Sequence, residues 1–201
     1  MTAPELRRDA ARNRDRILAA ARSSFDRDGL DVGVEAIAQR AGVGVGTLYR
    51  RFPTKEALFL AALEIDPTPA WHAEIDRRAG TGNCRDNLQS IFLSMLHFFN
   101  EMLPRTITAQ GSLGTLANRT FEGVEHPIFN DERKLQTFLR QEMELGRLHT
   151  GDVELLAQLI LGSLTSYIFR AVITGQTLTE DKLAQLAAGT VDFIWSGIAP
   201  D

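Results

Sequence analysis

The sequence of 201 residues has a single cysteine, Cys84. One cysteine excludes an internal disulfide and any metal site built from several cysteine ligands. We expect Cys84 to be a buried, inert thiol, and a redox-sensing thiol is the alternative.

Motifs typical of enzyme active sites are also lacking. The four histidines are scattered, and there is no HExxH pair, nucleophile elbow, phosphate-binding loop or carboxylate pair at a diagnostic spacing. His72 and Glu74 match the H-x-E part of a deaminase signature, but no P-C-x-x-C follows. We therefore expect a protein that is not an enzyme, with no cofactor and no metal ligands.

Long apolar runs are missing too, since no segment approaches the 18 or so uninterrupted apolar residues that suggest a membrane span. The first arginines are accompanied by Glu5 and Asp9, and no apolar core of the signal-peptide type follows them. With 44% apolar and 24% charged residues, the composition is that of an ordinary soluble protein. We expect a cytoplasmic location.

The net charge of -4 is unevenly distributed along the chain. Residues 1–60 hold 11 Lys and Arg against 8 Asp and Glu, whereas the remainder holds 11 against 18. This asymmetry is typical of a nucleic-acid-binding head on a body that does not itself adhere to phosphate. Arg7, Arg8, Arg12 and Arg14 could extend the basic region as a disordered arm in a minor groove, and a solvated arm without fixed contacts is the alternative.

The segment VEAIAQRAGVGVGTLYRRFPTK, residues 34–55, predicts two short helices joined by a glycine turn. The first helix covers about 34–41 and ends at Gly42, which can adopt a positive φ. The second helix covers about 45–52, and a helix at about 13–28 completes a three-helix core. The residues expected inside this core are Ile17, Leu18, Ala21, Phe25, Ile37, Ala38, Ala41, Leu48 and Phe52.

The outward face of the second short helix carries groups suited to DNA. Its cations can neutralise phosphates and its hydroxyls can donate to phosphate oxygens, whereas small residues at its start would meet base edges. Val45 can contact a thymine methyl or pack inward. Two short helices joined at glycine also occur in all-α proteins that bind no DNA. The candidate DNA contacts are Val45, Gly46, Thr47, Tyr49, Arg50, Arg51 and Lys55.

Beyond Ala57 the pattern is helical nearly throughout. Thr68 and Pro69 are expected to start a helix as N-cap and first residue, and Pro104 to begin a less regular piece that reaches about Asn118. The other helices are expected at about 57–65, 88–102, 128–145, 152–173 and 180–196. The last two carry apolar residues around more than one face, so a second copy of the chain is their natural partner.

Residues 12–59 resemble the DNA-binding domain of the TetR (tetracycline repressor) family of bacterial transcription regulators. The resemblance lies in RILAAARSSFDRDG, IAQRAGV, GTLYRRF and PTKEAL. Gly33 and Gly44 stand where the family usually has Ser or Thr, and Arg51 where it often has His. The resemblance implies DNA contacts at Thr47, Tyr49, Arg51 and Lys55, with Val45 and Gly46 near the bases.

The resemblance also implies an all-α protein of about nine helices. Residues 1–60 would be the helix-turn-helix domain, and residues 61–201 an effector-binding domain that forms a homodimer through the two carboxy-terminal helices. Two copies could read a palindromic double-stranded operator, since successive major grooves lie about 34 Å apart. The implied function is a repressor that a small, largely apolar effector releases from DNA.

The residues that could line an effector pocket are Phe92, Met95, Phe99, Met102, Phe138 and Tyr167, because Met is deformable and Phe broad. A tightly packed core without a cavity is the alternative interpretation of the same pattern. A helical small-molecule carrier is the rival function, and it would lack the salt-dependent DNA affinity that phosphate binding produces.

Overall fold

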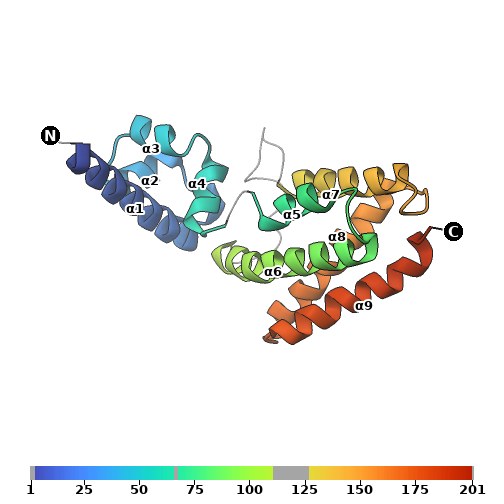
Figure 1. Cartoon of the computed structure of the whole chain (residues 1–201). Coiled ribbons are helices and arrows are strands. Elements are labelled where there is room, and N and C mark those ends of the chain that lie inside the picture. The colour runs from blue at the N-terminus through green and yellow to red at the C-terminus, as the bar shows by residue number, and fades with distance from the viewer. Residues whose placement is uncertain (1–2, 66–67, 111–126, 201) are drawn as a thin grey trace. The chain divides into compact units, whose positions relative to one another are not determined.

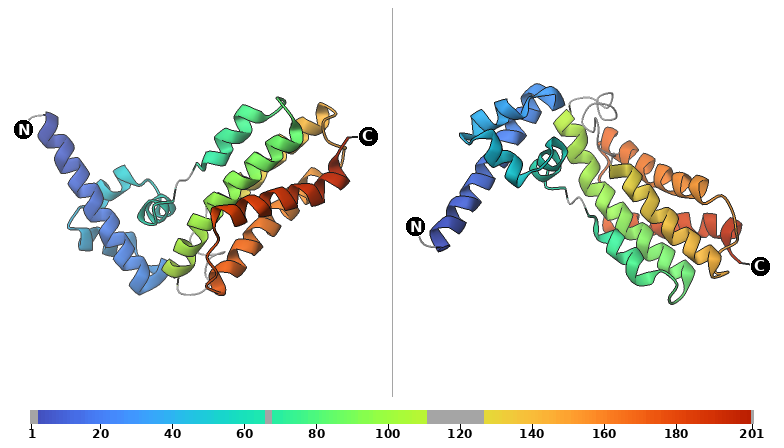
Figure 2. Two further views of the ribbon diagram at one scale, coloured as in Figure 1. Left: turned by 60° about the horizontal axis from the view of Figure 1, so that its bottom comes forward. Right: turned by 90° about the horizontal axis from the view of Figure 1, so that it is seen from above.

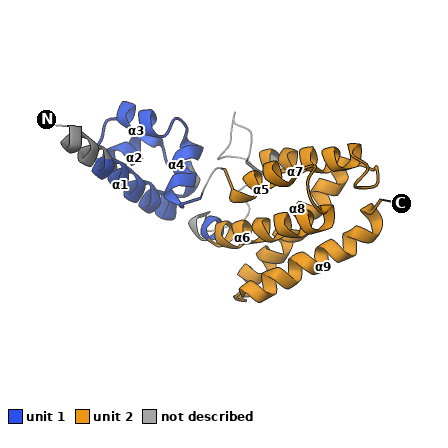
Figure 3. Cartoon of the chain, in the orientation of Figure 1, with its two compact units in different colours: residues 1–67, 105–124 blue, residues 68–104, 125–201 orange. Residues whose placement is uncertain are grey.

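A computed structural model describes residues 3–65, 68–110 and 127–200 (Figure 1). These residues form nine α-helices and one short 3-10 helix, and no strand occurs among them. The all-α prediction is therefore confirmed. The chain divides into two compact units, one of residues 1–67 with 105–124 and one of residues 68–104 with 125–201 (Figure 3).

The helices of the first unit are α1 (Ala3–Asp28), α2 (Val34–Ala41), α3 (Val45–Arg51) and α4 (Lys55–Ala62), with the 3-10 turn η1 (Gly29–Asp31) after α1. The second unit holds α5 (Ala70–Arg78), α7 (Pro127–Glu144), α8 (Val153–Ile173) and α9 (Glu180–Ile198). Helix α6 (Cys84–Gln110) is divided between the two units. The bounds of α2, α3, α8 and α9 agree with the predicted ones to within two residues.

The predicted start of the first helix was wrong, because α1 begins at Ala3 and not near residue 13. Pro4 lies in the first turn, where a missing N–H costs no helical hydrogen bond. Alanine and arginine, both good helix formers, dominate the following residues, so nothing stops the helix there. The proposed disordered arm is thus a helical continuation of α1.

Two proline positions also differ from expectation. Helix α5 begins at Ala70, and Pro69 is its N-cap with an extended backbone (φ -58°, ψ 147°) where Thr68 was expected. Helix α6 continues through Pro104 to Gln110. The prediction of irregular structure from Pro104 to about Asn118 is therefore wrong for residues 104–110. The rest of that segment lies outside the described residues. An internal proline removes one backbone hydrogen bond, and packing of the half-buried Met102 and Leu103 and the buried Thr106 offsets that loss.

The core of the first unit contains the residues that the periodicity predicted. Ile17, Ala21, Ile37 and Leu48 are at most 1% exposed, and Phe25 packs edge-on against Phe59 at a centroid distance of 5.1 Å. Two arginines tie helices together around this core. The Arg40 guanidinium donates to the Ser24 hydroxyl at 2.5 Å and to the Asp28 carboxylate at 2.8 Å.

The core of the second unit is built on α6. Leu88, Ile91, Phe92 and Met95 are completely buried there and pack with residues of α5, α7, α8 and α9. Figure 2 shows α6 running alongside α5 in both views. The three-to-four spacing of apolar residues therefore predicted the central helix of this unit correctly.

A buried carboxylate joins three segments at one end of the second unit. Glu142, on α7, has a side chain that is 0% exposed. Its Oε1 accepts a 2.6 Å hydrogen bond from the Gly80 N–H in the α5–α6 loop. Its Oε2 lies 2.7 Å from Arg147 Nε, close enough for an ion pair although the two lack the alignment of a hydrogen bond. Arg147 also donates to the Thr81 and Gly82 carbonyls, so Glu142 fixes the loop through both contacts.

Cys84 lies beside this carboxylate and is buried, as expected for an inert thiol. Burial, reinforced by the neighbouring Glu142 carboxylate, raises the pKa of the Cys84 thiol to about 12. The thiolate is the reactive form of cysteine, so very little of it is present at neutral pH. This favours the inert interpretation of Cys84 over the redox sensor.

Helix α8 is the one described helix whose length and composition would allow it to cross a membrane. The core helix of a soluble protein passes the same test. Six residues of α8 are buried in the second unit, namely Ala157, Ile160, Leu161, Leu164, Ile168 and Ala171. Part of the apolar surface of α8 is thus buried in the core of the second unit.

Candidate nucleic-acid interface

The turn between α2 and α3 depends on a left-handed glycine. Gly42 has φ 63° and ψ 39°, a conformation that residues with a Cβ rarely adopt. Its N–H donates to the Gln39 carbonyl at 3.1 Å, and the Val43 N–H donates to the Ala38 carbonyl at 3.0 Å. These two bonds satisfy carbonyls at the end of α2 and direct the chain into α3.

Two buried side chains anchor α3. Leu48 is 0% exposed and Phe52, at the end of the helix, is 6% exposed. Gly44 is the N-cap, in an extended conformation, and gives no side-chain hydrogen bond to the helix. A helix of this length gains little from propensity, so Leu48 and Phe52 fix which side of it faces outward.

The predicted contact residues gather on the other side of α3 and at the start of α4. Tyr49 is 43% exposed, Gly46 and Arg50 are also exposed, and the remaining predicted residues are half-buried. Those half-buried residues are Val45, Thr47, Arg51 and Lys55. Val45 packs partly against the core of the unit, so its side chain is shared between the core and the surface.

The start of α4 is capped as its sequence suggests. The Thr54 hydroxyl accepts a 3.1 Å hydrogen bond from the Ala57 N–H. This cap sets the direction of α4 and brings Lys55, its first residue, just after the end of α3. One short stretch of chain therefore presents the tyrosine hydroxyl and the cations together.

The sequence did not predict one contact on this face. It also could not tell arginines that hold helices together from arginines that are available to bind DNA. Arg50 Nη2 donates to the Thr47 hydroxyl at 3.2 Å, one helical turn apart. Arg22 donates to the Ala62 carbonyl at 2.5 Å and to Glu64 at 2.6 Å, so it holds α1 to the end of α4. The i, i+3 spacing of Thr47 and Arg50 was the available signal for the first contact.

The candidate effector residues lie in two different environments. Phe92, Met95, Phe99 and Phe138 are at most 2% exposed within the core of the second unit. Met102 is half-buried at the edge of that core. Tyr167 instead lines a groove between α8 and α9, so the structure does not bring the six residues together around one cavity that it describes.

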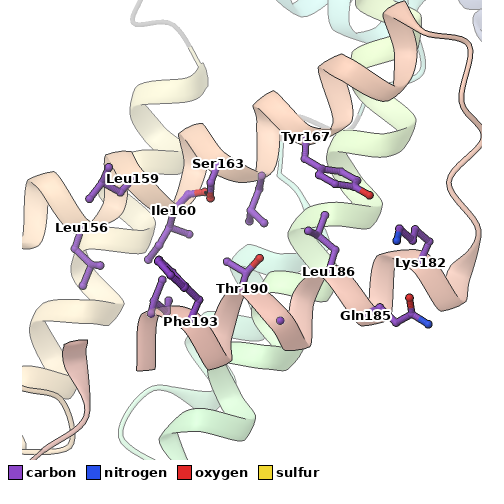
Figure 4. A pocket seen from close by; sticks show the side chains of 13 residues that line it. Leu156, Leu159, Ile160, Ser163, Tyr167, Lys182, Gln185, Leu186, Thr190 and Phe193 are labelled. Carbon is purple, nitrogen blue, oxygen red and sulfur yellow. Dashed lines mark hydrogen bonds between the residues drawn. The ribbon is translucent and has the colours of Figure 1, made fainter. Parts of the chain in front are cut away.

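The groove between α8 and α9 has a volume of about 660 Å³ (Figure 4). Leucine, isoleucine and phenylalanine side chains form most of its walls, and Tyr167 and Lys182 lie at one end. Among its lining residues, Leu159 is 60% exposed and Phe193 is 83% exposed. Exposed apolar surface of this kind is typical of interaction sites.

The core of the second unit also contains a buried indole nitrogen. The Trp71 indole Nε1 is buried and has no hydrogen-bond partner among the described residues. Its neighbour His72 pairs with Asp131 of α7 through Nε2 at 2.8 Å. Buried donors are normally satisfied, so Trp71 is a candidate donor to a bound molecule.

Comparison with known proteins gives matches over both units. Residues 17–62 match the profile of bacterial regulatory proteins of the tetR family, and residues 91–196 match that of the AefR-like transcriptional repressor C-terminal domain. HTH-type transcriptional regulators of Staphylococcus aureus are 39% identical over 62 residues, which is 30% of this chain. The match spans 34% of the length of those relatives.

Solved structures with a similar fold cover nearly the whole chain. A TetR-family regulator from Mesorhizobium loti has a TM-score of 0.63 at 20% identity, over 94% of this chain and 98% of its own. FadR from Bacillus subtilis, solved in complex with stearoyl-CoA, has a TM-score of 0.63 at 20% identity, over 90% and 97%. At this level of identity the likeness shows the fold alone.

Proposed function

The chain belongs to the TetR family of bacterial transcriptional regulators, and from this premise we propose that it is a homodimeric repressor released from a palindromic operator by a small, largely apolar effector. Family members are DNA-binding regulators and not enzymes. We assign DNA binding to residues 1–60, and effector binding and dimerisation to residues 61–201. We place the protein in the cytoplasm, where its operator would be.

One observation carries the DNA-binding proposal: α3 buries Leu48 and Phe52 and thereby exposes Tyr49 and Arg50. Phosphates would be bound by Tyr49, Arg50, Arg51 and Lys55, which position the head on the duplex. The groups nearest the bases would be Val45, Gly46 and Thr47. These small side chains favour contacts such as thymine methyls over bidentate hydrogen bonds to purines.

The dimer proposal rests on the exposed apolar surface of α8 and α9. Leu155, Leu159 and Ile173 lie along one side of α8 and are each more than half exposed, and Phe193 on α9 is more exposed still. Gly162 and Gly189 have open space where a Cβ would be, so packing within the chain does not require glycine there. Close approach of a second copy would explain both the apolar surface and the glycines.

Replacing Leu159 with Ala should weaken the dimer at least tenfold. Each copy loses apolar area at a twofold interface, and burial of such area contributes a free energy of roughly 25 cal/mol per Å². Leu145→Ala is the matched control, because Leu145 is 54% exposed but lies beyond the end of α7. Sedimentation equilibrium gives the dissociation constants. Equal constants for the two variants would place the interface elsewhere.

The effector proposal rests on the deformable Phe and Met side chains of the second unit and on the buried Trp71 indole. Trp71→Phe keeps an aromatic ring but removes the N–H donor. We expect a three- to tenfold rise in the effector concentration that releases DNA, since a hydrogen bond contributes about 1 kcal/mol. The measurement is DNA release by a panel of ligands with apolar chains, beginning with stearoyl-CoA, and an unchanged concentration would exclude the Trp71 N–H as a donor to the ligand.

Selection of bound fragments from the source genome tests the function as a whole. We expect enrichment of a palindrome whose half-sites are centred about one helical turn, or a multiple of it, apart. The genes beside it would suggest the effector. Failure to enrich any fragment, together with the absence of a salt-dependent affinity for DNA, would favour a small-molecule carrier.

A further inference from the structure

The end of α2 is fastened to α1 by one side chain. Arg40 is the last residue but one of α2. Its Nη1 donates to the Ser24 hydroxyl at 2.5 Å and its Nη2 donates to Asp28 Oδ2 at 2.8 Å, so one guanidinium reaches two residues of α1. A planar guanidinium that binds two acceptors at once fixes orientation as well as distance. Arg40 therefore constrains both the separation and the angle of the two helices where α2 ends.

The two acceptors of Arg40 are themselves held in place. Ser24 is 0% exposed, and its hydroxyl donates to the Ala20 carbonyl, one turn earlier in α1, at 2.7 Å. Asp28 is bound by Arg27, whose Nε and Nη2 donate to the two carboxylate oxygens at 3.0 and 3.2 Å. Because neither acceptor is free to follow Arg40, the contact resists movement of α2 along α1.

The position of α2 decides where the start of α3 lies. Helix α3 packs against α2, and α2 packs against α1. Residues 42–44 alone separate the end of α2 from the start of α3. With seven residues, α3 is too short to be stable by itself. A shift of the end of α2 on α1 would therefore carry with it the start of α3, which holds Val45, Gly46 and Thr47.

We propose that Arg40 is a positioning residue for sequence recognition, which keeps the start of α3 in register with the bases by holding the end of α2 to α1. The proposal rests on the proposed function, because it requires α3 to enter a groove of duplex DNA. Arg40 acts through α3 and not by contact with DNA. Base edges are read by contacts of fixed geometry, whereas cations attract the phosphate backbone without regard to sequence. Loss of Arg40 should therefore weaken operator binding more than non-specific binding.

The first test compares Arg40→Gln with Arg27→Gln. Both variants remove one cation from Asp28, but Arg27 is the sequence neighbour of Asp28 within α1 and joins no helices. The hydrogen-bonded amides of α3 should exchange with solvent about fivefold faster in Arg40→Gln, which corresponds to the loss of about one net hydrogen bond. Arg40→Lys should lie between, since an ammonium keeps the charge without the planar fork. Equal exchange in Arg40→Gln and Arg27→Gln overturns the proposal, whether or not the protein binds DNA.

The second test separates positioning from a loss of folded protein. Fluorescence anisotropy gives the affinities for the palindrome selected from the source genome and for a mixed-sequence duplex of the same length. Arg40→Gln should lower the ratio of these affinities about tenfold, which is the size of one good base contact. Its affinity for the mixed-sequence duplex should stay within about twofold of that of Arg27→Gln, which carries the same charge.

The outcomes of the second test distinguish the two levels of inference. A purely structural role would lower both affinities by the same factor, so an unchanged ratio in Arg40→Gln overturns this proposal alone. If the wild-type protein binds neither duplex, the proposed function fails and this proposal fails with it.

Discussion

The triple variant Tyr49→Ala, Arg51→Ala, Lys55→Ala should lose at least 100-fold in affinity for every duplex tested. Each residue would supply one phosphate contact, and a hydrogen bond to phosphate contributes about 1 kcal/mol or more. Removing two cations should also lower the salt slope by about 1.8 per protomer. The loss should be nearly equal for operator and mixed-sequence DNA, because phosphate contacts carry no sequence information.

The control for this experiment removes two cations from other surfaces, as Arg27→Ala with Arg77→Ala. Both are exposed, and both form ion pairs with neighbours in sequence, Asp28 and Glu74. None of the substitutions touches Leu48 or Phe52, so α3 should keep its anchors. Titration of fluorescent duplexes gives the affinities. Wild-type binding by the triple variant would show that α3 and the start of α4 are not the DNA-binding surface.

Glu142→Ala should destabilise the protein by about 3 kcal/mol. Removing one member of a buried ion pair costs about 3–5 kcal/mol, and the lower figure applies because the Arg147 side chain is 24% exposed. The Gly80 N–H also loses its acceptor, so the α5–α6 loop loses a contact to α7. Urea denaturation at one fixed protein concentration measures the effect, since dimerisation makes stability depend on concentration.

Glu144→Ala is the matched control, because Glu144 is an exposed carboxylate on the same helix and should change stability by about 0.5 kcal/mol at most. Glu142→Gln should fall between the two, since it keeps an acceptor for Gly80 but loses the charge. A loss for Glu142→Ala no larger than that for Glu144→Ala would mean that the buried contacts stabilise nothing. This outcome would be independent of DNA binding.

The sequence was sufficient to predict the helix-turn-helix because its signals are local. A glycine turn at Gly42 and apolar residues at helical spacing fix α2 and α3 without reference to the rest of the chain. The caps of α4 and α8 are local as well, because the Thr54 and Asp152 side chains accept hydrogen bonds from backbone N–H groups two or three residues further on. Which face of α3 is buried also followed from the spacing of Leu48 and Phe52.

Features that depend on tertiary contacts were missed. The pattern placed Pro104 at a helix end, because the cost of an internal proline is local whereas the packing that offsets it is not. Glu142 was overlooked although it continues the stripe of Leu135, Phe138 and Leu139 at helical spacing, since charged residues are rarely buried without a partner. Its partners Gly80 and Arg147 come from other segments.

The position of Pro104 within α6 has a mechanical consequence. The boundary between the two compact units falls between Pro104 and Arg105, so one helix belongs to both. Proline has no N–H, so one backbone hydrogen bond of α6 is missing at the residue where the helix passes from one unit to the other. A helix bends most easily at such a position, so α6 is less stiff there than an uninterrupted rod. On the far side of the proline, Arg105 donates to the Leu63 and Glu64 carbonyls after α4, so the part of α6 beyond Pro104 is fixed to the end of α4.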